Sequence, residues 1–248
     1  MKDSISPLDG RYSSYVEELL PFFSEKALMR YRVMIEIEYL IALSKEKKFD
    51  GLPRFTKKQK ASYRNIYLKF NSISADKIKK IERQTNHDVK AVEYYIRSKV
   101  NKSIHPWVHF ALTSEDVNNL SYTLMWKDAL NKIYIPQLKS LLSELNLLSR
   151  KYSNSPMLSM THGQAATPTT FGKEIKVFAK RIERQIDGIN KHKLLGKFGG
   201  ATGTWSTHTV VYPNINWILF AKNYIKSLNL DPNICLLYTS PSPRDATL

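Results

Sequence analysis

Six apolar side chains in the third quarter of the chain recur at steps of three or four residues. This spacing places them on one face of an α-helix, and it does not fit the two-residue period of a strand. A threonine followed by a proline, Thr167-Pro168, precedes them and is typical of a helix start. The six residues are Phe171, Ile175, Phe178, Ile182, Ile186 and Ile189. The sequence therefore predicts a long helix that begins at Thr167-Pro168 and has one apolar face.

Other segments have the same period. Ser24 can cap a helix that continues to about Lys47, and Asp88 opens another helix. Shorter basic helices are predicted near residues 61–70 and 75–82. From Ser114 onward two apolar stripes follow each other, and Pro136 between them predicts a kink or an interruption. The stripe residues are Leu28, Tyr31, Ile35, Tyr39 and Ala42 in the first helix, Val117, Leu120 and Leu124 after Ser114, and Leu138, Leu141, Leu142, Leu145 and Leu148 after Pro136.

Long helices joined by short loops predict an all-α fold. We expect an N-terminal helical domain over residues 1–110, followed by part of a long-helix bundle over 111–233. Residues 234–248 are rich in Ser and Pro and have no periodicity, so they are interpreted as a tail foreign to the fold. The Gly-rich segment 196–203 matches neither common pattern of a nucleotide-phosphate loop, and it predicts a tight turn, which can lie near a ligand.

The net charge is +16, which suits a polyanionic partner such as a nucleotide or a nucleic acid. No zinc-finger, basic-zipper or RNA-recognition signature occurs, so a nucleic acid is not the expected partner. The single cysteine, Cys235, excludes an internal disulfide and a cysteine-cluster metal site. No secretory signal or membrane-spanning apolar stretch is recognisable. These features predict a soluble cytoplasmic protein.

Histidines provide the candidate chemistry. His162 lies in a polar segment beside Gly163, and an imidazole there can transfer a proton near neutral pH, although a loop histidine taken alone is more often structural. His87, between Asn86 and Asp88 at a predicted helix start, can help bind an anion, and simple capping is the alternative. Thr113 and Ser114 repeat this arrangement. His105 and His109 are four residues apart, but the lack of a neighbouring glutamate and the presence of Pro106 disfavour a metal site.

Several motifs in order resemble those of the adenylosuccinate lyase family, within the fumarase/aspartase superfamily. The similarity covers about residues 5–233, the N-terminal part of the family pattern. The motifs are Ser6-Pro7-Leu8-Asp9-Gly10-Arg11-Tyr12, Thr85-Asn86-His87-Asp88, Thr113-Ser114-Glu115-Asp116 and Thr161-His162-Gly163-Gln164. The resemblance implies an all-helical homotetramer that releases fumarate from adenylosuccinate, giving AMP, and from the succinylated aminoimidazole carboxamide ribonucleotide of purine biosynthesis. It implies no metal and no organic cofactor.

The resemblance also implies roles for individual residues. His162 is the expected general acid that protonates the departing nitrogen. His87 is expected to orient the substrate phosphate beside Asn86 and Asp88. Arg11 and Tyr12 are expected to hold the nucleotide, and Thr113 and Ser114 to hydrogen-bond the succinyl group.

One element of the family pattern is absent. The family's mobile loop, S-S-x-M-P-x-K-x-N, carries the serine that abstracts the carbon-bound proton, and no such motif occurs in these 248 residues. We therefore expect an inactive fragment with uncovered apolar helix faces and low stability on its own. Three alternatives remain open: another fumarate-releasing lyase of the superfamily, such as argininosuccinate lyase or fumarase; a basic helical module that binds nucleic acid; and a non-catalytic structural fragment.

Overall fold

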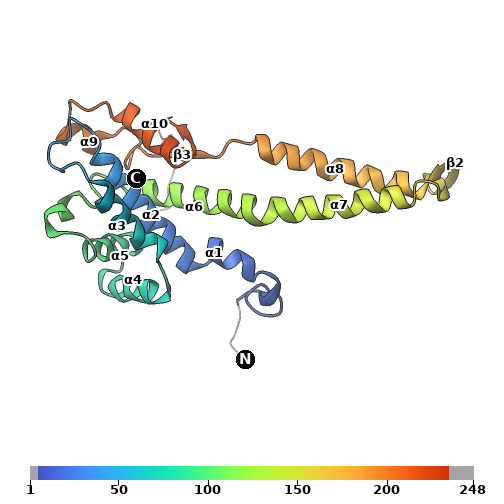
Figure 1. Cartoon of the computed structure of the whole chain (residues 1–248), viewed down its shortest axis with the longest axis horizontal. Helices are drawn as coiled ribbons and strands as arrows, with labels where there is room; N and C mark the ends of the chain where they lie inside the picture. The colour runs from blue at the N-terminus through green and yellow to red at the C-terminus, as the bar shows by residue number, and fades with distance from the viewer. Residues whose placement is uncertain (1–4, 235–248) are drawn as a thin grey trace, which may run out of the picture. The chain divides into compact units, whose positions relative to one another are not determined.

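The computed structural model describes residues 5–234, and most of these residues are helical (Figure 1). This confirms the all-α fold class. The tail predicted from residue 234 lies outside the described residues except for Ile234. No helix of the described part is long and apolar enough to cross a membrane. The helices are η1 (Ser13–Tyr15), η2 (Glu17–Leu19), α1 (Leu20–Phe23), α2 (Glu25–Leu43), α3 (Lys57–Leu68), α4 (Ser72–Thr85), α5 (Asp88–Arg97), η3 (Lys102–Trp107), α6 (Ser114–Ala129), η4 (Leu130–Tyr134), α7 (Ile135–Lys151), α8 (Phe171–Lys191), α9 (Ser206–Val211) and α10 (Trp217–Ser227).

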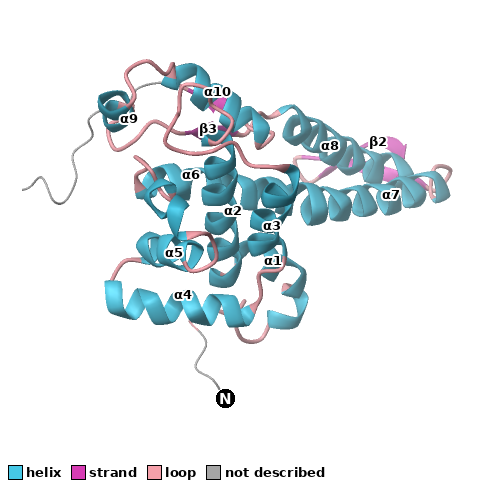
Figure 2. Ribbon diagram, turned by 60° about the vertical axis from the view of Figure 1, so that its left-hand side comes forward, coloured by secondary structure: helices cyan, strands magenta, loops and turns pink. Residues whose placement is uncertain are grey.

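Four short strands form two small sheets. β1 (Pro156–Thr161) and β2 (Gln164–Thr170) pair in an antiparallel hairpin, and β3 (Leu195–Lys197) and β4 (Asp231–Asn233) pair in parallel (Figure 2). The chain divides into two compact units. The first contains residues 1–126 and 194–248, and the second contains residues 127–193. These units do not divide the chain at the domain boundary predicted at 110/111. The predicted boundary stays a prediction, because the compactness of a unit does not define which helices join a larger bundle.

Helix α2 forms the centre of the first unit. Ser24 caps it as predicted, because Ser24 Oγ accepts the N–H of Ala27 at 3.1 Å. The helix packs against α3, α4 and α5, and it is buried on most of its circumference (Figure 2). Three of its predicted stripe residues, Tyr31, Ile35 and Tyr39, are fully buried, and Leu28 and Ala42 pack partly buried against the same core. The helix ends at Leu43, four residues before the predicted end.

A buried aromatic cluster closes this unit where α2 meets α10. The Tyr39 ring lies 5.4 Å from that of Phe198, 6.0 Å from that of Phe220 and 5.6 Å from that of Tyr224, measured between centroids. The Tyr224 hydroxyl donates to the Ile35 carbonyl at 2.8 Å. His208 is also fully buried here. The cluster fixes the segment after residue 194 to α2.

The two stripes after Ser114 are joined by a π-helical segment, η4, which precedes Ile135-Pro136. Proline has no N–H to donate to the carbonyl four residues earlier, and its ring crowds that carbonyl. A wider turn relieves the crowding and keeps the chain helical. The interruption predicted at Pro136 is therefore confirmed in the form of a π turn.

Helices α7 and α8 run side by side in the second unit, and the β1–β2 hairpin connects the end of α7 to the start of α8 (Figure 1). The predicted start of α8 at Thr167-Pro168 is wrong. Residues 164–170 pair with β1, Pro168 faces Leu158 in the register, and the helix begins at Phe171 with Thr170 as its cap. Proline is tolerated because this two-stranded ribbon has no neighbouring strand that needs its N–H. The apolar period from Phe171 onward is helical as predicted.

Replacing Gly172 by alanine is expected to lower the stability of the second unit by about 1–3 kcal/mol. A Cβ atom at Gly172 would lie 2.3 Å from the Ser149 carbonyl oxygen and 2.7 Å from the Ser153 nitrogen, and both are backbone atoms that cannot turn away. Thermal unfolding measures the change. Gly188→Ala in the same helix is the matched control: its Cβ meets nothing within 4 Å, so it is expected to be neutral or stabilising. Equal effects of the two substitutions would contradict this prediction.

Candidate functional site

The start of α5 brings three of the predicted site residues together. Asn86 has a left-handed backbone (φ 50°) and ends α4, and His87 is the cap of α5. The cap of α5 is His87, whose Nδ1 accepts the N–H of Lys90 at 3.1 Å, and not Asp88, which is the first residue of the helix. An Nδ1 that accepts leaves the proton of the neutral ring on Nε2. Because the His87 side chain is 52% exposed, this Nε2–H can reach a ligand in solvent.

Asp88 is held in place by Arg32, a residue that the sequence analysis did not single out. Asp88 Oδ1 accepts the N–H of Val89 at 2.8 Å, and Oδ2 pairs with Arg32 Nη2 at 2.7 Å. Arg32 Nε donates to Asn118 Oδ1 at 2.9 Å. The buried guanidinium of α2 therefore ties the start of α5 to α6. The sequence contained one sign of this role: Arg32 is a cation between Tyr31 and Val33, within the apolar pattern of α2.

The ion pair with Arg32 also shifts the pKa of Asp88. The Arg32 guanidinium and the N–H of Val89 outweigh the desolvation of the Asp88 carboxyl and lower its pKa. Asp88 is therefore a carboxylate at neutral pH, and it carries the negative half of a fixed ion pair. A ligand phosphate near this helix start would meet the partial positive charge of the α5 terminus and the His87 Nε2–H.

The start of α6 carries Thr113 and Ser114, both half-buried. Asp116 organises it: its carboxylate accepts the N–H of Thr113 at 3.0 Å, of Gly199 at 2.9 Å and of Gly200 at 3.1 Å. Burial raises the pKa of Asp116 in spite of these hydrogen bonds. Asn119 Oδ1 adds a hydrogen bond from the N–H of Lys197 at 2.9 Å. The Gly-rich segment predicted as a turn is thus a turn fixed against the Thr113-Ser114 motif.

Substituting Asp116 by asparagine is expected to destabilise the first unit by about 1–3 kcal/mol, because an amide replaces one acceptor oxygen with a donor that faces backbone N–H groups. Hydrogen exchange at the Gly199 and Gly200 amides is expected to accelerate in parallel. Glu115→Gln, at the exposed neighbouring position, is the matched control and should leave both quantities unchanged. Unchanged exchange in the Asp116 variant would show that other contacts hold the segment.

A second titratable pair lies deep in the first unit. His109 has a left-handed backbone (φ 62°), and its Nδ1 forms a short contact with Glu36 Oε1 of α2. Burial disfavours the charged imidazole, but the Glu36 and Glu93 carboxylates outweigh it and raise the pKa of His109. His109 is thus an ion-pair partner of Glu36. No group of three or more potential ligand side chains within residues 5–234 could hold a metal ion, and His105 and His109 do not form one.

His162 belongs to the second unit and occupies the hairpin turn between β1 and β2. His162 (φ 51°) and Gly163 (φ 75°) are both left-handed, as a two-residue hairpin turn requires. The imidazole is exposed, and it forms no hydrogen bond within the described residues. The prediction of a polar loop here was wrong, because the segment is a hairpin; the flanking residues 156–161 and 164–170 contain no β-branched or aromatic residue except threonine, so the pair His162-Gly163 was the one local signal of a turn.

Arg11 and Tyr12 lie in the turn before η1, and both are exposed. The Arg11 guanidinium carbon is 5.6 Å from the Tyr12 ring centroid, and the Tyr12 and Tyr15 rings are 6.3 Å apart. No described contact links this turn to His87 or Thr113. Arg32 therefore links Asp88 at the start of α5 to Asn118 in the first half of α6, while Arg11 and Tyr12 are exposed and no described contact joins them to either helix start.

The sequence of this chain matches that of a known protein family. A family model described as "Lyase" matches residues 10–227, which is most of the chain. The chain belongs to this lyase family. The match confirms the family resemblance drawn from the motifs, and all of the proposed site residues lie inside the matched range.

Individual lyases resemble the chain over about half of their length. It is 44% identical over 237 residues to adenylosuccinate lyase of Dictyostelium discoideum, covering 91% of this chain and 50% of the relative. It is 40% identical to adenylosuccinate lyase of Haemophilus influenzae, covering 93% and 52%. A solved fumarate lyase from Mesorhizobium has a TM-score of 0.70 at 17% identity, covering 87% of this chain and 48% of that one, which supports the fold alone.

Proposed function

We propose that this chain supplies the N-terminal part of an adenylosuccinate lyase active site. The reaction releases fumarate from adenylosuccinate, giving AMP, and from the succinylated aminoimidazole carboxamide ribonucleotide. The observation that carries the proposal is the 44% identity to an adenylosuccinate lyase over 91% of this chain. Two helix N-termini, those of α5 and α6, suit a substrate with a phosphate and two carboxylates.

In this reaction the bond between carbon and nitrogen breaks while the neighbouring carbon loses a proton. His162 delivers a proton to the departing nitrogen, a role that an exposed imidazole on a short turn can perform near neutral pH. His87, Asn86 and Asp88 bind and orient the phosphate, with the His87 Nε2–H as donor. Thr113 and Ser114 hydrogen-bond the succinyl carboxylates, and Arg11 and Tyr12 hold the nucleotide. The serine that takes the carbon-bound proton has no counterpart motif among these residues.

Binding can be tested without turnover. Calorimetric titration of the chain with adenylosuccinate is expected to show binding that His87→Ala weakens by about tenfold, the loss of one charge-assisted hydrogen bond. His192→Ala is the control, since His192 is an exposed residue outside the motifs. Argininosuccinate and fumarate serve as competitors. Tighter binding of argininosuccinate would favour another lyase of the superfamily, and tighter binding of duplex DNA would favour a nucleic-acid module.

We also propose that the second unit joins other copies in a homotetramer, with residues 111–233 forming part of a central bundle in a cytoplasmic enzyme. Large apolar side chains of this unit are exposed, and such faces mark interaction surfaces. They include Leu141, Leu147, Leu148, Met160, Phe171 and Phe178. Sedimentation equilibrium of the purified chain tests the proposal: a tetramer supports it, and a stable monomer at all concentrations contradicts it.

A further inference from the structure

The outer face of α3 contains a shallow hollow that none of the lyase motifs includes. Its volume is about 340 Å³, and Lys57, Lys60 and Arg64 line it together with Ala61, Asn65 and Leu68. No acidic side chain is among these lining residues. Thr56 and Gln59 form a complete capping box at the start of α3, so the helix that carries the three cations is well anchored. The hollow is therefore a cationic surface on a helix whose start is capped.

Arg64 is held rigidly at one end of this surface. Its Nε and Nη2 donate to the two carboxylate oxygens of Glu38, at 2.7 Å and 2.8 Å, and the Tyr67 hydroxyl donates to the same carboxylate at 2.8 Å. This fork leaves the Nη1 edge of the guanidinium for a ligand. Because Glu38 fixes the side chain, a ligand need not order it, which lowers the entropy lost on binding.

The other cations of this region lack neutralising partners. Within the described residues, no ion pair joins Lys45, Arg54, Lys57 or Lys60 to a carboxylate. Desolvation and then the charges of Lys45, Arg54 and Arg64 lower the pKa of Lys60, although this side chain is not deeply buried. The cations of this region therefore lie close enough to repel one another, although Glu38 balances the charge of Arg64.

The spacing of the cations indicates which anion fits. Lys57, Lys60 and Arg64 follow each other at three and four residues along one face, so they span about 10 Å of α3. A single phosphate cannot contact cations that are spread over this length, whereas a chain of linked phosphates can contact all three. We propose that the α3 hollow binds a run of phosphates, from either a single-stranded nucleic acid or a free polyphosphate chain. This site is separate from the motif residues of the proposed lyase reaction and does not depend on that function.

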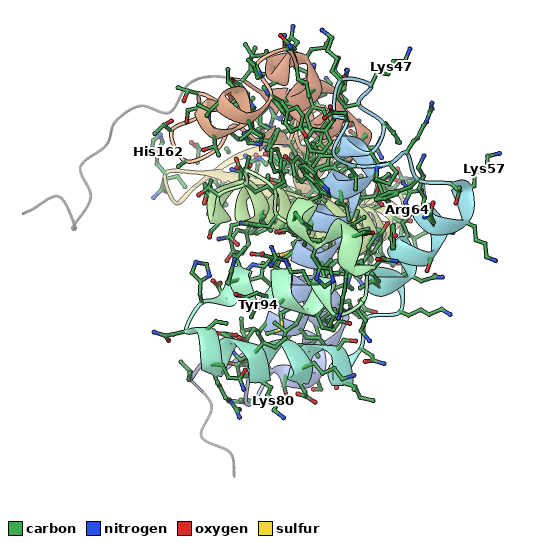
Figure 3. The ribbon with its side chains drawn as sticks, turned by 90° about the vertical axis from the view of Figure 1, so that its left-hand side faces the viewer. Lys47, Lys57, Arg64, Lys80, Tyr94 and His162 are labelled. Atoms are coloured by element: carbon green, nitrogen blue, oxygen red, sulfur yellow. The ribbon has the colours of Figure 1, made fainter. Side chains whose placement is uncertain are left out.

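Two charge-reversal variants of the whole chain test the proposal. Lys57→Glu with Lys60→Glu removes two cations from the hollow. Lys77→Glu with Lys80→Glu on α4 makes the same charge change at the same three-residue spacing, on exposed side chains outside the hollow. Figure 3 shows Lys57 and Arg64 on one side of the first unit and Lys80 away from them. The pair of variants therefore separates binding at the hollow from attraction by net charge.

The probes are a fluorescently labelled oligothymidylate and inorganic polyphosphate, followed by anisotropy and by competition at several salt concentrations. We expect the α3 variant to lose affinity by at least about tenfold and its salt slope to fall by about 1.4, since each lost phosphate contact removes about 0.7. The α4 variant should change affinity by about twofold or less. Urea unfolding of both variants checks that each is as stable as the parent chain.

Each outcome decides the question. Preferential loss in the α3 variant supports the proposal; tighter binding of the oligonucleotide then identifies a nucleic-acid strand, and tighter binding of polyphosphate identifies a free chain. Equal losses in the two variants would overturn it, because net charge alone would explain them. Failure of the parent chain to bind either probe at low salt would overturn it as well. Adenylosuccinate binding is measured separately, so either proposal can fail alone.

Discussion

Replacing His162 by alanine is expected to lower fumarate release by about 10²–10⁴-fold in a chain completed with the C-terminal half of the Haemophilus influenzae relative. We expect the added half to supply the serine loop of the family pattern, which these residues do not contain, and therefore to allow turnover. His162 occupies a hairpin turn and makes no described hydrogen bond, so its removal leaves the packing of the second unit intact. The loss would therefore report proton transfer to the departing nitrogen. Absorbance of adenylosuccinate measures the rate.

His192→Ala is the matched control, because it removes another exposed histidine from the same unit. It is expected to leave the rate unchanged. A His162 variant that folds and keeps the parent rate would exclude the acid role. A chain of only these 248 residues is expected to release no fumarate, and measurable release would show that a group other than the family serine can act as base.

Acidification is expected to destabilise the first unit through His208. This residue is fully buried, its Nε2 lies 3.2 Å from the Tyr39 hydroxyl, and its ring packs 4.8 Å from that of Trp217. Burial lowers the pKa of His208 from 6.5 to about 4. The unfolded chain thus takes up the proton first as the pH falls. At about 1.36 kcal/mol per pH unit, stability should fall by about 2 kcal/mol between pH 7 and pH 5 and by about 3 kcal/mol at pH 4.

Other shifted groups act outside this window or in the opposite direction. The raised pKa of His109 adds stability as the pH falls toward 6.5 and contributes a constant amount below it. The raised pKa of Asp116 favours the folded state at acid pH. The lowered pKa of Asp88 costs stability only below its ordinary value of 3.8. The loss between pH 6.5 and 5 is therefore attributable mainly to His208.

Urea unfolding at pH 7, 5 and 4 measures the effect, and His208→Phe isolates it. Phenylalanine fits a site lined by Phe110, Phe198 and Trp217, and the Tyr39 hydroxyl keeps its hydrogen bond to the Phe110 carbonyl at 2.9 Å. The variant should show a flatter profile over this range, whereas His192→Ala should retain the parent profile. A profile unchanged by His208→Phe would assign the acid sensitivity to other groups.

Local chemistry in the sequence predicted much of the fold. The Ser24 cap, the stripe of α2 and the apolar period after Phe171 depend on neighbouring residues, and the structure has all three. The family resemblance likewise came from short contiguous motifs. Their site roles stay predictions, since no described contact tests substrate binding.

What the sequence did not predict depends on distant partners. Thr167-Pro168 has the local pattern of a helix start, but pairing with residues 156–161 draws it into a strand. The role of Arg32 depends on Asp88 and Asn118, which contact its guanidinium and lie 56 and 86 positions later in the chain. The role of Asp116 similarly depends on Gly199, 83 residues further on. Periodicity within one segment carries no information about such contacts.

The hydrogen bonds between α6 and residues 197–200 have a consequence for the order of folding. Asp116 and Gly199 are far apart in sequence, and joining them through a flexible chain would cost about 4 kcal/mol in loop-closure entropy. The residues between them include α7, the hairpin and α8, whose mutual contacts are comparatively local and can form early. Pairing of α7 with α8 brings the start of α7 and the end of α8 closer together along the chain and shortens the effective loop. We therefore expect the second unit to form before the hydrogen bonds between Asp116 and residues 199–200 that complete the discontinuous first unit.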